Sequence, residues 1–281
     1  MISGPADLHT HSTHSDGLCS PGDLVRAAAT VGLAALAITD HDTLSAIPIA
    51  QPEAQRLGLH LIPGVEITAD YRNRTIHLLG HFLDPNHAPL QSALLSLRTA
   101  RLQRLSQLAD RLEHLGYPID LNALRSHWPR ASLGRRHLAL WLARTGQVQS
   151  PEAAFLGPLA DHQTADLPSP RLPWADALAL IHAAGGTSAL AHPPRWLTLA
   201  DLARLQAAGL TALEVDSPRL SRSRSGSLRQ LANRLNLVPI AGSDFHAPDR
   251  PGSFVGRLST PANILGQLLD RKMQPPSTRF S

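Results

Sequence analysis

The stretch Ser20-Pro-Gly-Asp-Leu-Val-Arg-Ala-Ala-Ala-Thr-Val-Gly-Leu-Ala-Ala-Leu-Ala-Ile-Thr-Asp-His41 decides the fold class of this 281-residue chain. Ser20 is a typical helix N-cap, Pro21 suits the first helical position, and Gly32 predicts the end of that helix. The apolar run at 33–39 has the length and composition of a buried parallel strand. The stretch therefore predicts a helix, a turn and a strand whose carboxyl end leads into polar residues.

Six more short apolar runs resemble the one at 33–39, and helical stretches fall between most of them. The seven predicted strands are 6–9, 33–39, 60–67, 75–80, 186–191, 211–215 and 237–241. Strands that alternate with helices favour an α/β fold with a parallel sheet. Residues 91–167 break the alternation, because they lack a strand signal and contain leucines at helical spacing. We therefore expect a helical insertion at 91–167 between two parts of the α/β domain, 1–90 and 168–281.

Composition excludes several classes of protein. A single cysteine, Cys19, excludes a framework of intramolecular disulfides and a metal site built from several thiolates. No run approaches the roughly 18 apolar residues of a membrane span, and the first residues do not resemble a secretory signal. We therefore expect a cytoplasmic protein with no membrane association and no obligate protein partner. The net charge is only +4, which argues against strong non-specific binding to nucleic acid.

Histidine is the unusual residue type, with 15 in the chain. Six histidines and three acidic residues lie at predicted strand ends or in the loops that follow. They are His9, His11, Asp16, His41, Glu66, His77, His192, Asp244 and His246. Functional groups gather at the carboxyl ends of parallel strands, and burying nine such groups together without cations would be costly. Because nine ligands exceed the needs of one ion, we predict two to three divalent metal ions.

The same residues lie in a series of motifs. The motifs are Asp7-Leu-His-Thr-His-Ser-Thr-His-Ser-Asp-Gly17, Thr39-Asp-His-Asp-Thr43, Gly64-Val-Glu66, Ile76-His77, Ala191-His-Pro193 and Gly242-Ser-Asp-Phe-His246. In this order, over nearly the whole chain, they resemble the motifs of the polymerase-and-histidinol-phosphatase (PHP) family. The helical insertion and the segment Gly134-Arg-Arg-His137 resemble one branch of the family, which contains nucleoside 3′,5′-bisphosphate phosphatases and 5′-to-3′ exoribonucleases.

The resemblance implies a distorted seven-stranded (β/α) barrel of PHP type, with the helical insertion as a substrate lid over a site for three metal ions. The implied ligand sets are His9, His11, Glu66 and Asp244 for one ion, Glu66, His77 and His192 for a second, and Asp16, His41 and His246 for the third. Asp16, Glu66 and His192 are the expected catalytic residues. The branch favours Mn²⁺, and ligands without thiolate also suit Fe²⁺ or Zn²⁺.

The implied activity is hydrolysis of the 3′-phosphoester of 5′-phosphorylated nucleotides, by a water whose pKa the ions lower toward neutrality. Nucleoside 3′,5′-bisphosphates and short 5′-phosphorylated oligoribonucleotides are the expected substrates. Arg135, His137 and Arg195 are the predicted substrate contacts, since arginine forks suit phosphate. The loop 157–167 departs from the pattern of the branch, which leaves its substrate contacts open. A histidinol-phosphate-type phosphatase and a non-catalytic metal-binding module are the alternatives, and the complete ligand set disfavours the second.

Overall fold

The computed structural model describes residues 2–167, 169–248 and 253–273. Seven strands form the wall of a barrel in the order β1-β2-β3-β4-β6-β7-β8. Their bounds are Ala6–Asp7 (β1), Ala35–Ile38 (β2), His60–Tyr71 (β3), Arg74–His81 (β4), Thr187–Leu190 (β6), Ala212–Asp216 (β7) and Val238–Ala241 (β8). An additional short strand, Leu172–Pro173 (β5), pairs with β3 outside this path. The seven strands of the path correspond to the seven predicted runs, which confirms the predicted fold class.

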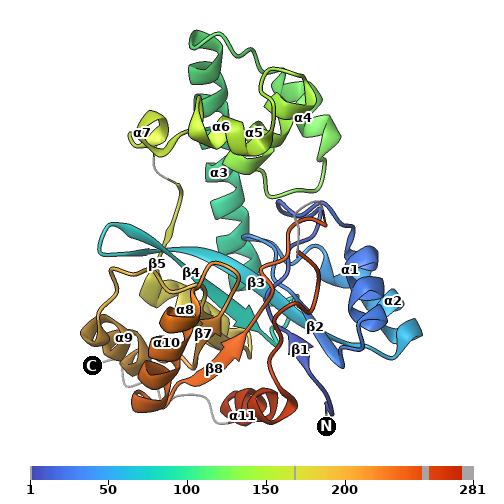
Figure 1. The fold of residues 1–281 in the computed structure, drawn as a ribbon, viewed down its shortest axis with the longest axis vertical. Coiled ribbons are helices and arrows are strands. Elements are labelled where there is room, and N and C mark those ends of the chain that lie inside the picture. The colour runs from blue at the N-terminus through green and yellow to red at the C-terminus, as the bar shows by residue number, and fades with distance from the viewer. Residues whose placement is uncertain (1, 168, 249–252, 274–281) are drawn as a thin grey trace.

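Helices surround the barrel and form the insertion above it (Figure 1). Around the barrel lie Pro21–Thr30 (α1), Ile47–Leu57 (α2), Trp174–Ala183 (α8), Leu199–Ala207 (α9), Arg222–Arg234 (α10) and Ala262–Met273 (α11). The insertion contains Ala88–His114 (α3), Leu121–His127 (α4), Arg135–Arg144 (α5), Pro151–Leu156 (α6) and Asp161–Thr164 (α7). None of the described helices combines the length and the apolarity needed to cross a bilayer.

Strand β4 runs antiparallel to both of its neighbours, whereas the sequence predicted a parallel sheet. The two-residue turn Arg72-Asn73 joins β3 to β4, and its residues have positive φ angles of 56° and 61°. This backbone forms a tight hairpin, and so short a connection cannot cross over to a parallel strand. The remaining pairs on the path are parallel. The carboxyl ends of the other six strands therefore meet at one end of the barrel.

Thr260 closes the barrel between β1 and β8. Its backbone N–H donates to Ala6 O at 2.7 Å, and its carbonyl accepts from Ala6 N at 2.9 Å. Its hydroxyl donates to Ala241 O and accepts from Ala241 N, both at 2.9 Å. Closer to the barrel end beneath the insertion, His11 N donates to Phe245 O at 2.9 Å. At this seam, the Thr260 side chain and loop contacts replace a regular ladder of backbone hydrogen bonds between β1 and β8. The missing ladder is what makes the barrel distorted.

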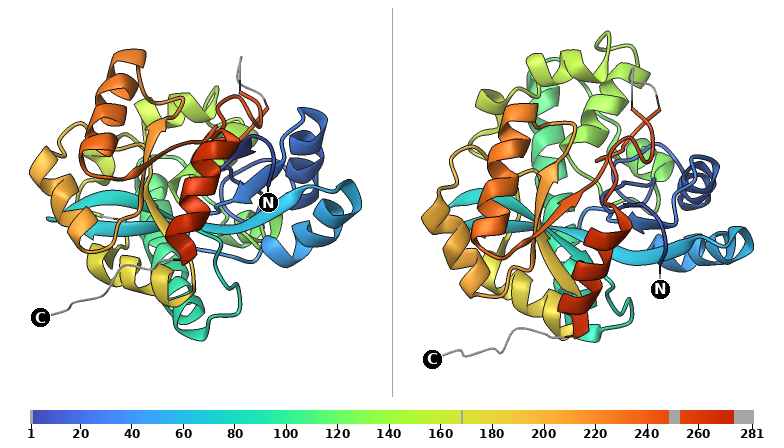
Figure 2. Two further views of the ribbon diagram at one scale, coloured as in Figure 1. Left: turned by 90° about the horizontal axis from the view of Figure 1, so that it is seen from below. Right: turned by 60° about the horizontal axis from the view of Figure 1, so that its bottom comes forward.

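Alanines and larger aliphatic side chains together fill the interior of the barrel. Ala35 and Ala37 of β2 belong to the interior cluster, together with Leu265 and Leu268 of α11. Leu36, between the two alanines, packs into the larger core between the sheet and the outer helices, as strand alternation requires. Helix α11 lies across the barrel end that faces away from the insertion (Figure 2). The opposite end, beneath the insertion, is left for a functional site.

Helix α3 is shared by two hydrophobic cores. Leu90 and Leu97 pack into the large core around the sheet, whereas Leu105 and Leu112 pack into a separate core with the other helices of the insertion. The part of the chain that rises above the barrel therefore begins near the middle of α3 (Figure 1). The predicted role of this part as a substrate lid remains a prediction.

Candidate active site

The structure brings all nine predicted ligands together at the end of the barrel beneath the insertion. Among the described residues, four groups of histidine and acidic residues have potential ligand atoms within 4.8 Å of one another, and these groups contain the nine residues and no others. The nine residues come from the strands or the following loops of β1, β2, β3, β4, β6 and β8. We call these nine residues the metal cluster.

Glu66 lies at the centre of the metal cluster, with its two oxygens facing different histidines. Its Oε2 atom lies 3.2 Å from His11 Nε2 and 3.1 Å from His41 Nδ1. Its Oε1 atom lies 2.9 Å from His77 Nδ1 and 3.0 Å from His192 Nε2. The side chain is only 1% exposed. A buried carboxylate with imidazole nitrogens around each oxygen is suited to bridge two cations.

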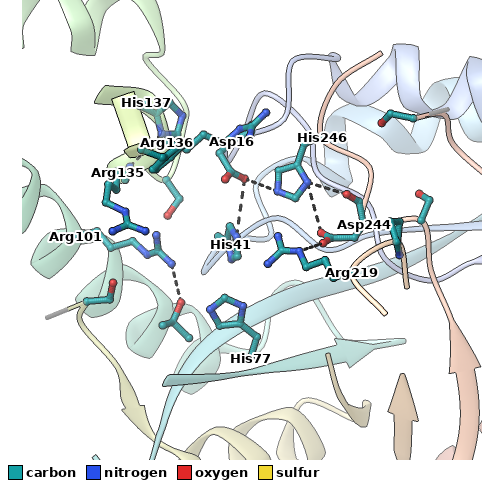
Figure 3. A pocket seen from close by; sticks show the side chains of 18 of the residues that line it. Asp16, His41, His77, Arg101, Arg135, Arg136, His137, Arg219, Asp244 and His246 are labelled. Carbon is teal, nitrogen blue, oxygen red and sulfur yellow. Dashed lines mark hydrogen bonds and ion pairs between the residues drawn. The ribbon is translucent and has the colours of Figure 1, made fainter. Parts of the chain in front are cut away.

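Two further carboxylates face histidines on either side of Glu66. Asp244 Oδ1 lies 3.5 Å from Nε2 of both His9 and His11. Asp16 Oδ1 lies 3.3 Å from His246 Nε2, and Figure 3 shows these two side chains next to each other with their polar atoms facing. Each of the three carboxylates therefore has several histidine partners, and some of the histidines face two carboxylates.

Five buried atoms of the metal cluster have no hydrogen-bond partner in the described part of the chain. These atoms are His9 Nε2, His11 Nε2, Asp16 Oδ1, His41 Nδ1 and Asp244 Oδ1. An unpaired buried polar atom costs about 1–3 kcal/mol, so five of them at one place indicate ligands that the protein itself does not supply. Divalent cations bind this combination of imidazole nitrogen and carboxylate oxygen. The residues therefore fit the predicted metal ions.

Electrostatics also favour cations at this position. Burial raises the pKa of Glu66, but neighbouring histidines, His41 foremost, outweigh burial and hold that pKa well below its usual value. Burial lowers the pKa of His11, but Asp244 and Glu66 outweigh burial and raise that pKa to about 9. The ionised carboxylates thus require positive charge beside them, from protonated rings or from metal ions. Metal ions supply that charge and leave the imidazoles neutral, as ligation requires.

A cavity of about 800 Å³ lies between the metal cluster and the insertion. Its volume is within the range of about 300–1,000 Å³ that is usual for small-molecule sites. Six of the lining residues are arginines, namely Arg101, Arg104, Arg135, Arg136, Arg219 and Arg257. Figure 3 shows Arg101 and Arg135 on one side of Asp16 and His41, and Arg219 on the other side of His41, next to Asp244. The cavity therefore presents positive charge to a ligand on both sides of His41.

Comparison with known proteins identifies the family. Residues 7–151 match the PHP domain family. The chain belongs to the PHP family. It is 37% identical to the 5′-3′ exoribonuclease Rnm of Escherichia coli (strain K12), over 92% of this chain and 91% of that protein. It is 34% identical to the 3′,5′-nucleoside bisphosphate phosphatase of Chromobacterium violaceum, over 89% of this chain and 90% of that protein.

A solved structure supports the same assignment. A protein from Bifidobacterium adolescentis, described as a metal-dependent phosphoesterase, superposes with a TM-score of 0.88 at 28% identity, over 95% of this chain and 96% of that one. The fold of the PHP domain therefore extends over nearly the whole chain, and the metal cluster is its candidate metal centre.

Buried Glu214 on β7 contacts two residues of the metal cluster. Its Oε1 atom lies 2.9 Å from His9 Nδ1, and its Oε2 atom accepts a hydrogen bond from His192 N. A carboxylate behind a ligating histidine fixes the ring so that the other nitrogen faces the metal. Glu214 was not among the residues predicted to be functional. The sequence did contain one indication of a role for Glu214, because it is an acidic residue inside an otherwise apolar predicted strand.

We expect Glu214→Gln to lower the affinity of the PHP centre for divalent metal roughly 10- to 100-fold, since the amide holds the His9 ring less firmly. Titration of the metal-free protein against a competing chelator measures this affinity. Glu53 of α2, which pairs with Arg26 and Arg56 at the surface, provides the matched control, because Glu53→Gln makes the same chemical change far from the PHP centre. Equal affinities for Glu214→Gln and Glu53→Gln would show that Glu214 does not support the metal ligands.

Two aspartates of the PHP motifs position the ligand loops and do not belong to the metal cluster. Asp40 accepts hydrogen bonds from Ser12 N at 2.7 Å, Ser12 Oγ at 2.6 Å and Ser15 Oγ at 2.6 Å. Asp7 accepts a hydrogen bond from Ser243 N at 2.9 Å. Both aspartates are fully buried, so these bonds satisfy carboxylates that would otherwise be costly to bury. The bonds to Asp40 fix the loop after β1, and the bond to Asp7 fixes the loop after β8.

Three arginines gather on the insertion side of the cavity, and we call Arg101, Arg104 and Arg135 the arginine group. Arg101 is anchored by Asp42 Oδ2 at 2.5 Å and by Thr68 Oγ1 at 2.7 Å. Burial lowers the pKa of Arg104 to about 10, and the charges of Arg135 and Arg101 add to this effect. Positive charges that repel one another favour the binding of an anion between them. Arg101 and Arg104 were not predicted as functional residues, because arginines on the polar side of a helix usually face solvent.

Arg135, a predicted substrate contact, lines this cavity. Its Nη1 atom donates to Asp161 Oδ1 at 2.7 Å and to Thr164 Oγ1 at 3.1 Å. Its guanidinium carbon lies 5.2 Å from the centre of the Phe155 ring. The Asp161 side chain is 93% exposed, so the ion pair is weak. An anionic substrate can therefore replace the carboxylate.

The other two predicted substrate contacts are placed differently from the prediction. His137 lines the cavity, but its Nδ1 atom accepts from Gly134 N and its Nε2 atom lies 2.9 Å from Ser15 O, so neither ring nitrogen is free. Burial lowers the pKa of His137 to about 4, which keeps the ring neutral. His137 therefore ties the insertion to a ligand loop. Arg195 is exposed and is not among the lining residues, because the adjacent Trp196 packs against the core outside the barrel.

Proposed function

We propose that this PHP protein hydrolyses the 3′-phosphoester of nucleotides that carry a 5′-phosphate. Nucleoside 3′,5′-bisphosphates give 5′-monophosphates and phosphate, and short 5′-phosphorylated oligoribonucleotides give 5′-mononucleotides. The observation that carries the proposal is that the arginine group and the metal cluster share one cavity. Such a cavity can bind a terminal phosphate at one side while a second phosphate reacts at the other. Relatives with 33–37% identity over most of their length carry the names of these two activities.

The metal cluster is proposed to hold three divalent ions. Their ligand sets are His9, His11, Glu66 and Asp244, then Glu66, His77 and His192, then Asp16, His41 and His246. Imidazole and carboxylate ligands without thiolate suit Mn²⁺, which we favour, and also Fe²⁺ or Zn²⁺. Bound divalent ions lower the pKa of a water and neutralise charge on the phosphoryl group.

Side chains of the protein orient the substrate. Arg135 receives the 5′-phosphate in place of Asp161, and Arg101 and Arg104 add positive charge beside it. Ser132 lines the same side of the cavity, and its buried hydroxyl has no partner among the described residues, so it is free to donate to the substrate. These contacts fix the first nucleotide by its 5′ end.

Arg219 provides a cation beside Asp244, on the side of His41 that faces away from the arginine group. Its Nε atom lies 2.7 Å from Asp244 Oδ2, and its side chain is 57% exposed. One edge of the guanidinium therefore orients Asp244, while the remaining N–H groups are available to an oxygen of the reacting phosphate.

The reaction balances in the same way for both substrates. The oxygen of water bonds to phosphorus, the bond from phosphorus to the 3′-oxygen breaks, and the 3′-oxygen takes up a proton. A bisphosphate thus releases free phosphate. An oligonucleotide releases its first nucleotide and keeps the phosphate as the new 5′ end of the shortened strand, which can then bind to the arginine group in turn.

The test is a panel of phosphate esters assayed with added Mn²⁺ and again with chelator. The panel contains a nucleoside 3′,5′-bisphosphate, the matching nucleoside 3′-monophosphate and histidinol phosphate. We expect the bisphosphate to be hydrolysed with the highest kcat/KM and the chelator to stop turnover. Preference for histidinol phosphate would support the histidinol-phosphate-type alternative. Metal binding without turnover of any ester would support the non-catalytic alternative.

A further inference from the structure

The cavity continues past the metal cluster, away from the arginine group. Pro218, Arg219, Ser253 and Arg257 line this part, which we call the distal end. Figure 3 shows Arg135 and Arg219 on opposite sides of His41, with Arg219 next to Asp244. The proposed contacts of a single nucleotide with its two phosphates use the arginine group and the metal cluster, and they leave most of the distal end without a ligand.

A turn at 253–257 carries two exposed side chains: Arg257 lines the distal end, and Phe254 is the neighbour in the chain of the lining residue Ser253. Val255 is 2% exposed and packs into the large core, and the next backbone N–H donates to Asp7 Oδ2 at 2.8 Å. On this anchored turn, Phe254 is 51% exposed. Arg257 is also exposed and forms no ion pair with any residue that the structure describes. Aromatic rings that stack on bases and cations that bind phosphates are the usual contacts to single-stranded RNA.

The geometry of the proposed reaction requires a site for the second nucleotide of an RNA substrate. In an in-line displacement, the water and the leaving 3′-oxygen lie on opposite sides of the phosphorus. The second nucleotide is attached through another oxygen of the same phosphate, which points sideways from that line. Because the first nucleotide extends from the metal cluster to the arginine group, the distal end is the part of the same cavity that remains for the second.

We propose that the distal end binds the nucleotide that follows the scissile phosphate, with Phe254 stacked on its base and Arg257 bound to its 3′-phosphate. This inference rests on the proposed function and deepens it. A nucleoside 3′,5′-bisphosphate has no second nucleotide and does not use the distal end, whereas an oligonucleotide does. The two activities therefore share the metal cluster and the arginine group but differ in their need for the turn at 253–257.

A second groove is a weaker candidate for this role. His14, Arg98 and Arg130 line it, and among the described residues it shares Ser132 alone with the cavity of the metal cluster. Ser132 N also donates to His14 O at 2.8 Å, which joins the two loops that separate the groove from the cavity. The exposed Arg130 is therefore a suitable control for Arg257.

Three substrates test the inference through initial rates of release of the first 5′-mononucleotide. They are a nucleoside 3′,5′-bisphosphate, a 5′-phosphorylated dinucleotide, and the same dinucleotide with a further 3′-phosphate. We expect Phe254→Ala to lower kcat/KM about tenfold for both dinucleotides. We expect Arg257→Ala to lower it about tenfold for the 3′-phosphorylated dinucleotide and much less for the other. Neither variant should change hydrolysis of the bisphosphate, which also shows that each variant is folded.

The outcomes separate this inference from the proposed function. The inference is overturned if both variants lose activity equally on all three substrates, or if they lose none. It is also overturned if Arg130→Ala, and not Arg257→Ala, selectively impairs the dinucleotides, because the second groove would then hold the second nucleotide. Failure of the unaltered protein to hydrolyse either the bisphosphate or the dinucleotides would contradict the proposed function itself, and the inference with it.

Discussion

Glu66→Gln is expected to lower kcat/KM for a nucleoside 3′,5′-bisphosphate on the order of a thousandfold, the upper end of what removal of one electrostatic group costs. The two oxygens of Glu66 face different histidines, so either orientation of the amide places an NH₂ group where a metal ligand is needed. Bound metal per chain should fall as well. Steady-state kinetics with saturating Mn²⁺ and elemental analysis of the purified protein measure the two effects.

The control for this variant is Glu53→Gln, which removes a carboxylate from the surface of α2. Glu53→Gln should keep full activity and full metal content. If Glu66→Gln kept the activity and the metal content of the unaltered protein, Glu66 could not be the shared ligand of two ions, and the arrangement of the metal centre would have to be revised.

Arg135→Ala is expected to lower kcat/KM for the bisphosphate about 10- to 100-fold while metal content stays unchanged. Hydrogen bonds to charged groups contribute about 1.5–3 kcal/mol each, and kcat/KM reports their loss in the transition state. The matching nucleoside 3′-monophosphate lacks the 5′-phosphate and should be affected much less. Parallel kinetics on the two substrates make this comparison.

Asp161→Asn is the matched control, because it breaks the same ion pair but keeps the guanidinium. This variant should not lower kcat/KM for the bisphosphate, since an exposed carboxylate that competes with the substrate has been removed. Equal losses in Arg135→Ala and Asp161→Asn would mean that the ion pair acts by holding the insertion in place. Unchanged kinetics in Arg135→Ala would mean that Arg101 or Arg104, and not Arg135, binds the 5′-phosphate.

Most of the metal cluster could be predicted from the sequence because its residues follow strands closely, although Glu66 and His77 lie within β3 and β4. His9 and His11, for example, follow β1 directly, and strand ends of a barrel meet whatever the details of packing. The reversed direction of β4 was missed, since a strand pattern gives no direction and the turn at Arg72-Asn73 lacks glycine. Glu214 was missed for a related reason: a strand pattern does not show which acidic residue faces the barrel interior.

The arginines of the cavity were harder to predict, because their role depends on how distant parts of the chain pack. Arg101 and Arg104 lie on a helix whose first half packs on the barrel, and only the position of α3 relative to the barrel shows that they face the metal cluster. Arg257 follows a turn that a hydrogen bond to Asp7 anchors, a contact across 249 positions of sequence. No local pattern in the sequence reports such contacts.

The central claim is that the protein recognises a 5′-phosphate and cleaves the next phosphoester along the strand. The most direct measurement compares a dinucleotide that carries a 5′-phosphate with the same dinucleotide that carries a 5′-hydroxyl, each with added Mn²⁺ and with all products identified. The 5′-phosphorylated dinucleotide should be cleaved with the higher kcat/KM and should give two 5′-mononucleotides. Preference for the 5′-hydroxyl form, or release of the 5′-phosphate as inorganic phosphate, would contradict the claim.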